Sequence, residues 1–197
     1  MRSAPFTEVV TPLAFDAAHS PVSERDHAAG SADAPLTLLE YGDYQCPHCA
    51  AAAPVVHALQ RSFGGHLRFV FRNFPLTKMH PAAEPAAEFA EGAAAQGKFW
   101  EVHDALFACS RKHGPESIGP AAFTAIALGL KLDATRLEKD VASERHLERI
   151  KADLSSGERS GVSGTPTFFI NGRRFEGPPS VNELAEALND VAHRHSA

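Results

Sequence analysis

Residues 36–49 read LTLLEYGDYQCPHC, and this stretch decides the fold. Its first half, Leu36–Tyr41, is short and mostly apolar, which is typical of a strand buried on both faces. Its second half ends in Cys46-Pro47-His48-Cys49, where an Ala-rich stretch begins whose composition favours a helix over residues 46–63. The two cysteines are therefore predicted to lie at a strand-to-helix junction, with Cys46 at the amino end of the helix.

A second strand is predicted directly after this helix. Gly64 and Gly65 end the helix, because glycine tolerates the left-handed conformation that often follows a helix terminus. In the run Leu67–Arg72, apolar side chains alternate at period two, as they do on one face of a strand. Strand, helix and strand together predict a β-α-β unit.

Helical spacing replaces this pattern over residues 76–157, which we expect to form an all-helical insertion. Phe99, Trp100 and Phe107 recur at helix-face intervals, and we expect them in the core of this insertion. Asp133 is predicted to cap a short helix that follows it.

A hairpin is predicted after the insertion. The apolar run Thr167–Ile170 and the run Arg173–Phe175 are separated by Asn171-Gly172, a strong signal for a two-residue hairpin turn. Ser180, with Glu183 three residues later, predicts the start of a last helix, which we expect to end near residue 193.

The predicted fold class is therefore α/β, in the order β-α-β, helical insertion, β-β-α. The expected segments are a partly ordered lead-in (1–33), a first half (34–75), the insertion (76–157), a second half (158–193) and a tail (194–197).

Composition is that of an ordinary globular protein. The chain has 197 residues, of which 44% are hydrophobic and 22% charged, so collagen, coiled coil and wholesale disorder are excluded. A net charge of −5 gives no electrostatic reason to bind nucleic acid. No run approaches the 18 apolar residues that a membrane span needs, so we expect no membrane insertion. Residues 1–34 do not resemble a signal peptide, which predicts a cytoplasmic location, or a periplasmic one if the start site is mis-assigned.

The cysteine pair carries the predicted chemistry. At a helix amino end, free N–H groups and the helix dipole favour a thiolate, so Cys46 is predicted to be the attacking sulfur and Cys49 the resolving one. Pro47 suits the first helical turn, where no N–H donor is needed. A protonated His48 would add a positive charge that favours the thiolate further.

Two other interpretations of the pair remain open. A lone C-x-x-C is also half of a zinc site, and the only other candidates at metal-ligand spacing are Cys109 and His113. The same pair could also serve a redox-sensing or metal-holding module without turnover. The strand-to-helix context favours redox exchange, so we expect no metal and no bound cofactor, with electrons carried by Cys46 and Cys49. Cys109 is predicted to be a free, dispensable thiol at a helix end.

Glu40 is a carboxylic acid inside the apolar strand, six residues before Cys46. Burial without a partner would raise its pKa toward neutrality and make it a candidate proton shuttle for Cys49. The alternative is a residue of an edge strand that faces water; Leu38 and Leu39 beside it favour burial. Pro54 is predicted to interrupt the helix bonding eight residues after Cys46.

The segment Gly161–Ile170, with Thr165-Pro166 just before the predicted hairpin, resembles the DsbA-like branch of the thioredoxin superfamily. That resemblance implies a thioredoxin fold with a cis Thr165–Pro166 bond opposite the cysteines. It also implies that the Thr165 backbone pairs with an extended substrate peptide, while Pro166 keeps a backbone N–H away from the thiols. Threonine before the proline resembles the isomerase and reductase branches.

Three further motifs carry the same resemblance, which covers about residues 35–191: YGDYQ at 41–45, FRNFPL at 71–76 and QGKFWEVHDALF at 96–107. They are similar to stand-alone bacterial DsbA-like proteins and to the thioredoxin-like domain appended to some sodium/proton antiporters. The resemblance implies a thiol-disulfide oxidoreductase that acts on protein or peptide thiols and disulfides, with a redox partner of unknown identity. A branch related to glutathione transferases has serine at the attacking position, and Cys46 argues against it.

Overall fold

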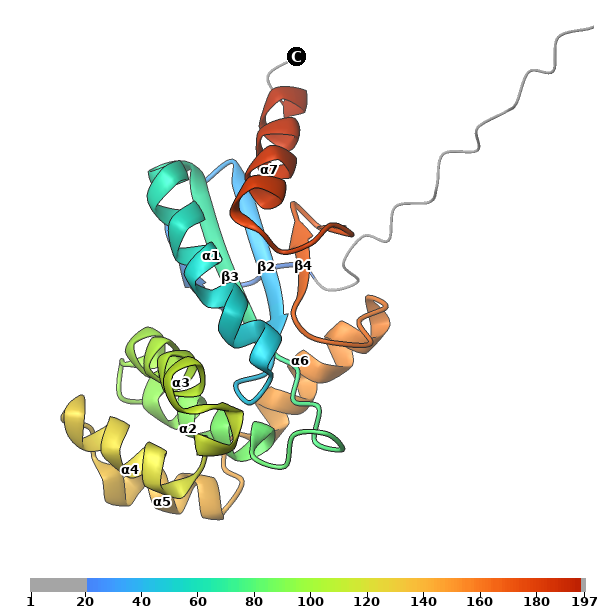
Figure 1. The fold of residues 1–197 in the computed structure, drawn as a ribbon. Helices are drawn as coiled ribbons and strands as arrows, with labels where there is room; N and C mark the ends of the chain where they lie inside the picture. The colour runs from blue at the N-terminus through green and yellow to red at the C-terminus, as the bar shows by residue number, and fades with distance from the viewer. Residues whose placement is uncertain (1–20, 196–197) are drawn as a thin grey trace, which may run out of the picture.

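The structure is a computed structural model that describes residues 21–195, and it contains a mixed five-stranded sheet with helices on both faces (Figure 1). The elements are, in order, β1 (His27–Ala29), β2 (Leu36–Gly42), α1 (Pro47–Phe63), η1 (Gly64–His66), β3 (Leu67–Asn73), α2 (Ala83–Ala94), α3 (Phe99–His113), η2 (Pro115–Ser117), α4 (Pro120–Gly129), α5 (Ala134–Ala142), α6 (Leu147–Arg159), β4 (Thr167–Ile170), β5 (Arg173–Arg174) and α7 (Val181–His195).

The sheet has the strand order β1-β3-β2-β4-β5, and its pairing confirms the predicted fold class. β2 runs parallel to β3 and antiparallel to β4, so the β-α-β unit and the β-β-α unit join side by side in one sheet. The helices α2–α6 lie between these two units in the chain. At the hairpin turn, Asn171 and Gly172 adopt φ values of 46° and 81°, the left-handed conformation that an Asn-Gly turn accommodates.

Side chains alternate between the two faces of the sheet along each strand, so the apolar ones form two separate clusters. Leu38 and Phe69 face α1 and α7 on one side of the sheet, whereas Leu39 and Val70 face the side that α6 covers. Since successive side chains point to opposite faces, Glu40 lies on the same face as Leu38, beneath α1. This register places a carboxyl group on the face that carries the cysteines.

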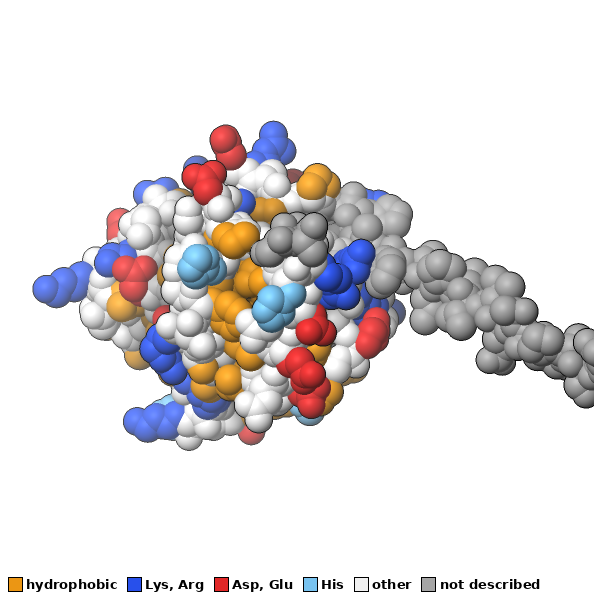
Figure 2. Space-filling model, turned by 90° about the horizontal axis from the view of Figure 1, so that it is seen from above, with side chains coloured by type: hydrophobic (Ala, Val, Ile, Leu, Met, Phe, Trp, Pro, Cys, Tyr) orange, Lys and Arg blue, Asp and Glu red, His pale blue; other side chains and the backbone are white. Residues whose placement is uncertain are grey.

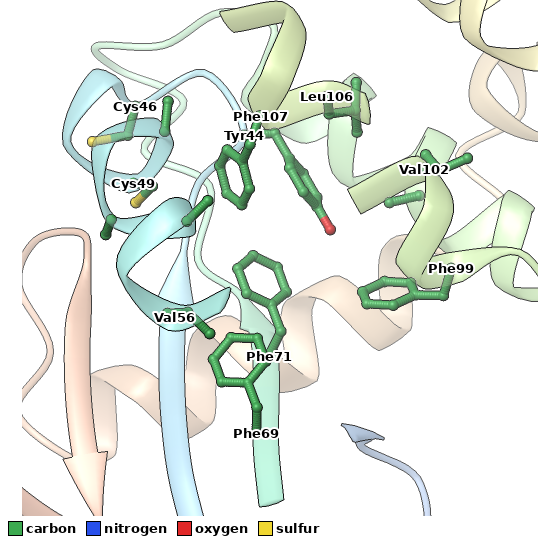
Figure 3. Packing of buried hydrophobic residues seen from close by; sticks show 14 of the residues in the cluster. Tyr44, Cys46, Cys49, Val56, Phe69, Phe71, Phe99, Val102, Leu106 and Phe107 are labelled. Carbon is green, nitrogen blue, oxygen red and sulfur yellow. The ribbon is translucent and has the colours of Figure 1, made fainter. Parts of the chain in front are cut away.

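The helical insertion is joined to the sheet by aromatic side chains (Figure 3). Tyr44, next to the cysteines, packs against Phe71 of β3 and Phe107 of α3, with ring centroids 5.3 and 5.0 Å apart. Its hydroxyl lies 3.1 Å from Nδ1 of His103, whose pKa burial lowers to about 3. The predicted core positions Phe99 and Phe107 are buried. The insertion and the first half of the sheet therefore share one core.

The described part of the predicted lead-in, residues 21–33, contributes the strand β1 to the sheet. β1 pairs antiparallel with β3, and Asp26 makes two hydrogen bonds of 2.7 and 2.9 Å to the buried Arg72 guanidinium. A three-residue strand carries too little alternation for the sequence pattern to predict it. The rest of the predicted lead-in, residues 1–20, lies outside the described residues, as do residues 196–197 of the predicted tail. α7 continues two residues beyond its predicted end at residue 193.

Figure 2 looks onto the end of the sheet away from Cys46, where apolar side chains reach the surface among charges of both signs. A groove at this end, between α1 and α7, is lined by Phe63, His66, Ala185 and Ala192 among others. Within residues 21–195, no helix has the length and apolar character that a membrane crossing requires.

Candidate active site

The amino end of α1 presents the two cysteines. Cys46 is the N-cap residue, with extended backbone angles, and Pro47 occupies the first helical turn as predicted. The N–H of Cys46 donates to the carbonyl of Asp43 at 3.1 Å, and the carbonyl of Cys46 accepts the N–H of Ala50, which closes the first turn of the helix. Both cysteines are buried, whereas Pro47 and His48 are exposed.

The environment of Cys46 favours its thiolate. A hydrogen bond from the Cys49 side chain is the largest cause that lowers the pKa of Cys46, to about 5 from 9.0. Hydrogen bonds from the backbone of Cys49 and His48 lower the pKa further, while burial opposes these contacts. His48 thus acts through its backbone. The His48 side chain is exposed, and the expectation that a charged ring assists stays a prediction.

Cys49 has the opposite character. Burial raises the pKa of its thiol well above 9.0, and the hydrogen bond to Cys46 and the negative charge of Glu40 raise it further. The backbone N–H of Asp43 lies 3.5 Å from Sγ of Cys49 and donates to it. The pair therefore combines one acidic thiol with one that holds its proton, as its position on the helix predicts.

Glu40 is buried, with 1% of its surface exposed, so the expectation of burial is confirmed and the edge-strand alternative is wrong. Its Oε1 has no hydrogen-bond partner within the described part of the chain. Burial and the nearby negative charge of Cys46 raise the pKa of Glu40 to about 8. Gly42 packs closely against Glu40 and Phe71. A Cβ at this position would lie 2.4 Å from the Phe71 ring and 3.1 Å from Oε1 of Glu40.

The loop before β4 lies across from the cysteines. The Thr165–Pro166 bond is cis, as the family resemblance implies. Sγ of Cys46 lies 3.4 Å from the carbonyl oxygen of Thr165, which places this loop in contact with the attacking sulfur. Residues 119 positions apart in the sequence thus meet at one site.

Asp43 organises the turn between β2 and α1, and its role is not apparent from the sequence. Its buried carboxylate accepts the N–H of Gln45 at 2.8 Å, the N–H of Leu76 at 3.0 Å and Nδ1 of His80 at 2.7 Å. Gln45 in turn accepts the N–H of Ala82 at 2.6 Å. An acidic residue in a buried segment is the one signal that could have marked it.

Cys109 lies apart from this pair, in α3, and its Sγ is 3.4 Å from the hydroxyl of Ser117. The cysteines are all free. Among the described residues, no group of three or more His, Cys, Asp or Glu side chains has the arrangement of a metal site.

A cleft of about 740 Å³ opens beside Gln45, between α2, α4 and α5. Phe89 and Phe123 stack in it, with ring centroids 4.7 Å apart, and its charged lining residues are Glu116 and Glu138. The cleft is therefore apolar within and acidic at its rim. Its lining includes Gln45, the residue before Cys46 in the sequence.

The profile of the thioredoxin family matches residues 22–190. The chain belongs to the thioredoxin family. The chain is 44% identical over 165 residues to an Na⁺/H⁺ antiporter, NhaA 3, from Salinispora tropica, a match that covers 84% of this chain and 24% of the antiporter. A second antiporter, NhaA 1 of Salinispora arenicola, is also 44% identical, over 168 residues and 25% of its length. The chain thus spans about a quarter of the length of these relatives.

Solved structures of DsbA-like proteins have the same fold. Oxidised BdbD from Bacillus subtilis matches with a TM-score of 0.76 at 23% identity, over 84% of this chain and 92% of BdbD. DsbA2 from Pseudomonas aeruginosa matches with a TM-score of 0.68 at 29% identity, over 88% of this chain and 98% of DsbA2. The resemblance of this thioredoxin-family chain to DsbA-like proteins is confirmed.

Proposed function

We propose that this protein is a thiol-disulfide oxidoreductase that exchanges the Cys46–Cys49 dithiol or disulfide with protein or peptide substrates, without a bound cofactor. The observation that carries the proposal is the opposite pKa shift of two buried, neighbouring thiols, one lowered to about 5 and the other raised. At pH 7 such a pair holds one nucleophilic thiolate and one proton in reserve.

The exchange proceeds in two steps. The Cys46 thiolate attacks one sulfur of a substrate disulfide, so the substrate S–S bond breaks, a Cys46–substrate bond forms, and the second substrate sulfur leaves as a thiolate that takes up a proton. Cys49 then loses its proton and attacks Sγ of Cys46, which forms the Cys46–Cys49 disulfide and releases the first substrate sulfur. Two electrons pass to the substrate, and the reverse sequence oxidises a substrate dithiol.

Glu40 is the proposed proton acceptor in the second step. While Cys46 is a thiolate, its charge helps to keep Glu40 protonated. In the mixed disulfide that charge is gone, so the pKa of Glu40 falls and its carboxylate can take the proton of Cys49. Glu40 therefore becomes a carboxylate when the mixed disulfide forms, which is the step at which Cys49 must lose its proton.

Substrate binding is proposed at two places. The Thr165 backbone, next to Pro166, would pair with an extended segment of the substrate. The cleft beside Gln45 offers an apolar surface with Glu116 and Glu138 at its rim. This arrangement favours substrates that carry an apolar side chain near a basic one.

Reduction of insulin disulfides in the presence of dithiothreitol tests the proposal. Cys46→Ser should abolish turnover. Cys49→Ser should attack once and stall as a mixed disulfide on Cys46, which mass spectrometry detects. Metal analysis of the same preparations separates the redox activity from a metal-holding module. Absence of turnover together with one bound zinc per chain would replace the proposal by that alternative.

A further inference from the structure

The His80 side chain reaches the turn that carries the cysteines from outside the motif. It belongs to the loop between β3 and α2, and its Nδ1 donates to Oδ2 of Asp43 across 2.7 Å. The Asp43 side chain is fully buried, whereas 16% of the His80 side chain reaches solvent. The loop itself is ordered by hydrogen bonds from the N–H groups of Met79 and His80 to the carbonyl of Leu76.

Asp43 links His80 to both cysteines. Its backbone N–H donates to Sγ of Cys49 at 3.5 Å, and its carbonyl accepts the N–H of Cys46 at 3.1 Å. Movement of Asp43 would therefore change the contacts of both sulfur-bearing residues. Among residues 21–195, three donors hold the Asp43 carboxylate: the His80 side chain and two backbone N–H groups.

We propose that His80 is a positioning residue for the disulfide exchange, which holds the Asp43 carboxylate and thereby sets the reduction potential of the Cys46–Cys49 couple. This inference rests on the proposed function, since it concerns the same cysteine pair. His80 touches neither sulfur, and it acts through Asp43.

The direction of its effect follows from geometry. Without the His80 donor, the buried Asp43 carboxylate loses one of the three hydrogen bonds that hold it among the described residues. A less firmly held Asp43 weakens the contact from its N–H to Sγ of Cys49. That contact favours the reduced sulfur, so its loss destabilises the dithiol form relative to the disulfide, and the reduction potential becomes more negative.

A matched histidine–aspartate pair is present on the surface. His57 of α1 lies 2.9 Å from Oδ1 of Asp104 in α3, but both side chains are more than 40% exposed. Within residues 21–195, the pair makes no hydrogen bond to Asp43 or to the cysteine turn. His57→Leu is therefore the control for the loss of a histidine–carboxylate contact as such.

Equilibration of the full chain with glutathione buffers tests the inference. His80→Leu, which removes the donor, should shift the equilibrium constant about three- to tenfold toward the disulfide, or about 15–30 mV for a two-electron couple. His80→Asn keeps a donor near the position of Nδ1 and should restore the parent potential. His57→Leu should leave the potential unchanged. If leucine prevents folding, His80→Ala removes the donor with less bulk and gives the same comparison.

A double-mutant cycle shows whether His80 acts through Asp43. In an Asp43→Asn background, His80→Leu should no longer change the potential. An unchanged potential in folded His80→Leu, or equal effects of His80→Leu in both backgrounds, would overturn the inference. Failure of the parent protein to form a reversible Cys46–Cys49 disulfide would instead overturn the proposed function.

Discussion

Replacement of Glu40 by glutamine should stabilise the protein and at the same time slow it. The substitution keeps the size of the side chain but removes its ionisation. Glu40 is buried, and its Oε1 lacks a hydrogen-bond partner among the described residues, so its charged form has no compensating contact there. A residue whose replacement raises the free energy of unfolding but lowers the rate contributes to activity at a cost in stability. The effects of Glu40→Gln on stability and on rate can be measured separately.

The size of the stability gain follows from the pKa of Glu40. Burial raises this pKa from 4.5 to about 8. Between these values the folded protein holds a proton that the unfolded chain has released, so the free energy of unfolding falls as pH rises through this window. From the unfolded-state pKa of 4.5 to pH 7 there are about two and a half pH units, and each lowers the free energy of unfolding by about 1.4 kcal/mol. Glu40→Gln should therefore gain about 3 kcal/mol at pH 7 and nothing near about pH 4.

Urea unfolding of the reduced parent and Glu40→Gln proteins across this pH range measures the gain. Cys46 titrates in both proteins, so the difference between them contains the ionisation of Glu40 and its coupling to the Cys46 thiolate. Stopped-flow kinetics should show that resolution by Cys49 slows more than attack by Cys46. Glu88→Gln is the matched control: burial raises the pKa of Glu88 to about 7, but it lies in α2 and should leave both rates unchanged. No difference in stability at pH 7, or equal slowing of both steps, would refute the reasoning.

Three further outcomes are expected. Cys109→Ala should reduce insulin at the parent rate, and a folded variant without activity would show that this thiol takes part. Asp26→Asn should cost about 3 kcal/mol in the free energy of unfolding by urea, because it leaves the buried Arg72 guanidinium without its carboxylate; a loss below about 1 kcal/mol would argue against a tightly bound amino-terminal segment. The double substitution Glu116→Lys and Glu138→Lys should lower kcat/KM about fivefold for a disulfide peptide with lysines beside a leucine. The same peptide with neutral residues in place of the lysines should keep its kcat/KM. Equal effects on both peptides would exclude the rim charges as the cause.

The parts of the fold that could be predicted from the sequence are those encoded by neighbouring residues. The buried strand before Cys46, the Asn171-Gly172 turn and the Ser180 cap each depend on a few adjacent positions, and all three are confirmed. The N–H of Glu183 donates to the Ser180 hydroxyl at 3.3 Å, which is the contact that their spacing predicts.

The parts that could not be predicted depend on residues far apart in the sequence. The Asp43–His80 contact joins positions 37 residues apart, and no local pattern in the sequence brings the two residues together. β1 is stabilised by pairing with β3 and by the Asp26–Arg72 ion pair rather than by its own composition. Such contacts follow from the tertiary packing, which local periodicity does not specify.

The redox equilibrium of the Cys46–Cys49 pair with glutathione tests the central claim most directly. We predict one reversible two-electron transition, at a potential less negative than the value of about −270 mV for thioredoxin, because a Cys46 thiolate with a pKa of about 5 stabilises the dithiol form. Two cysteines that stay reduced at every ratio of glutathione to its disulfide would contradict the account.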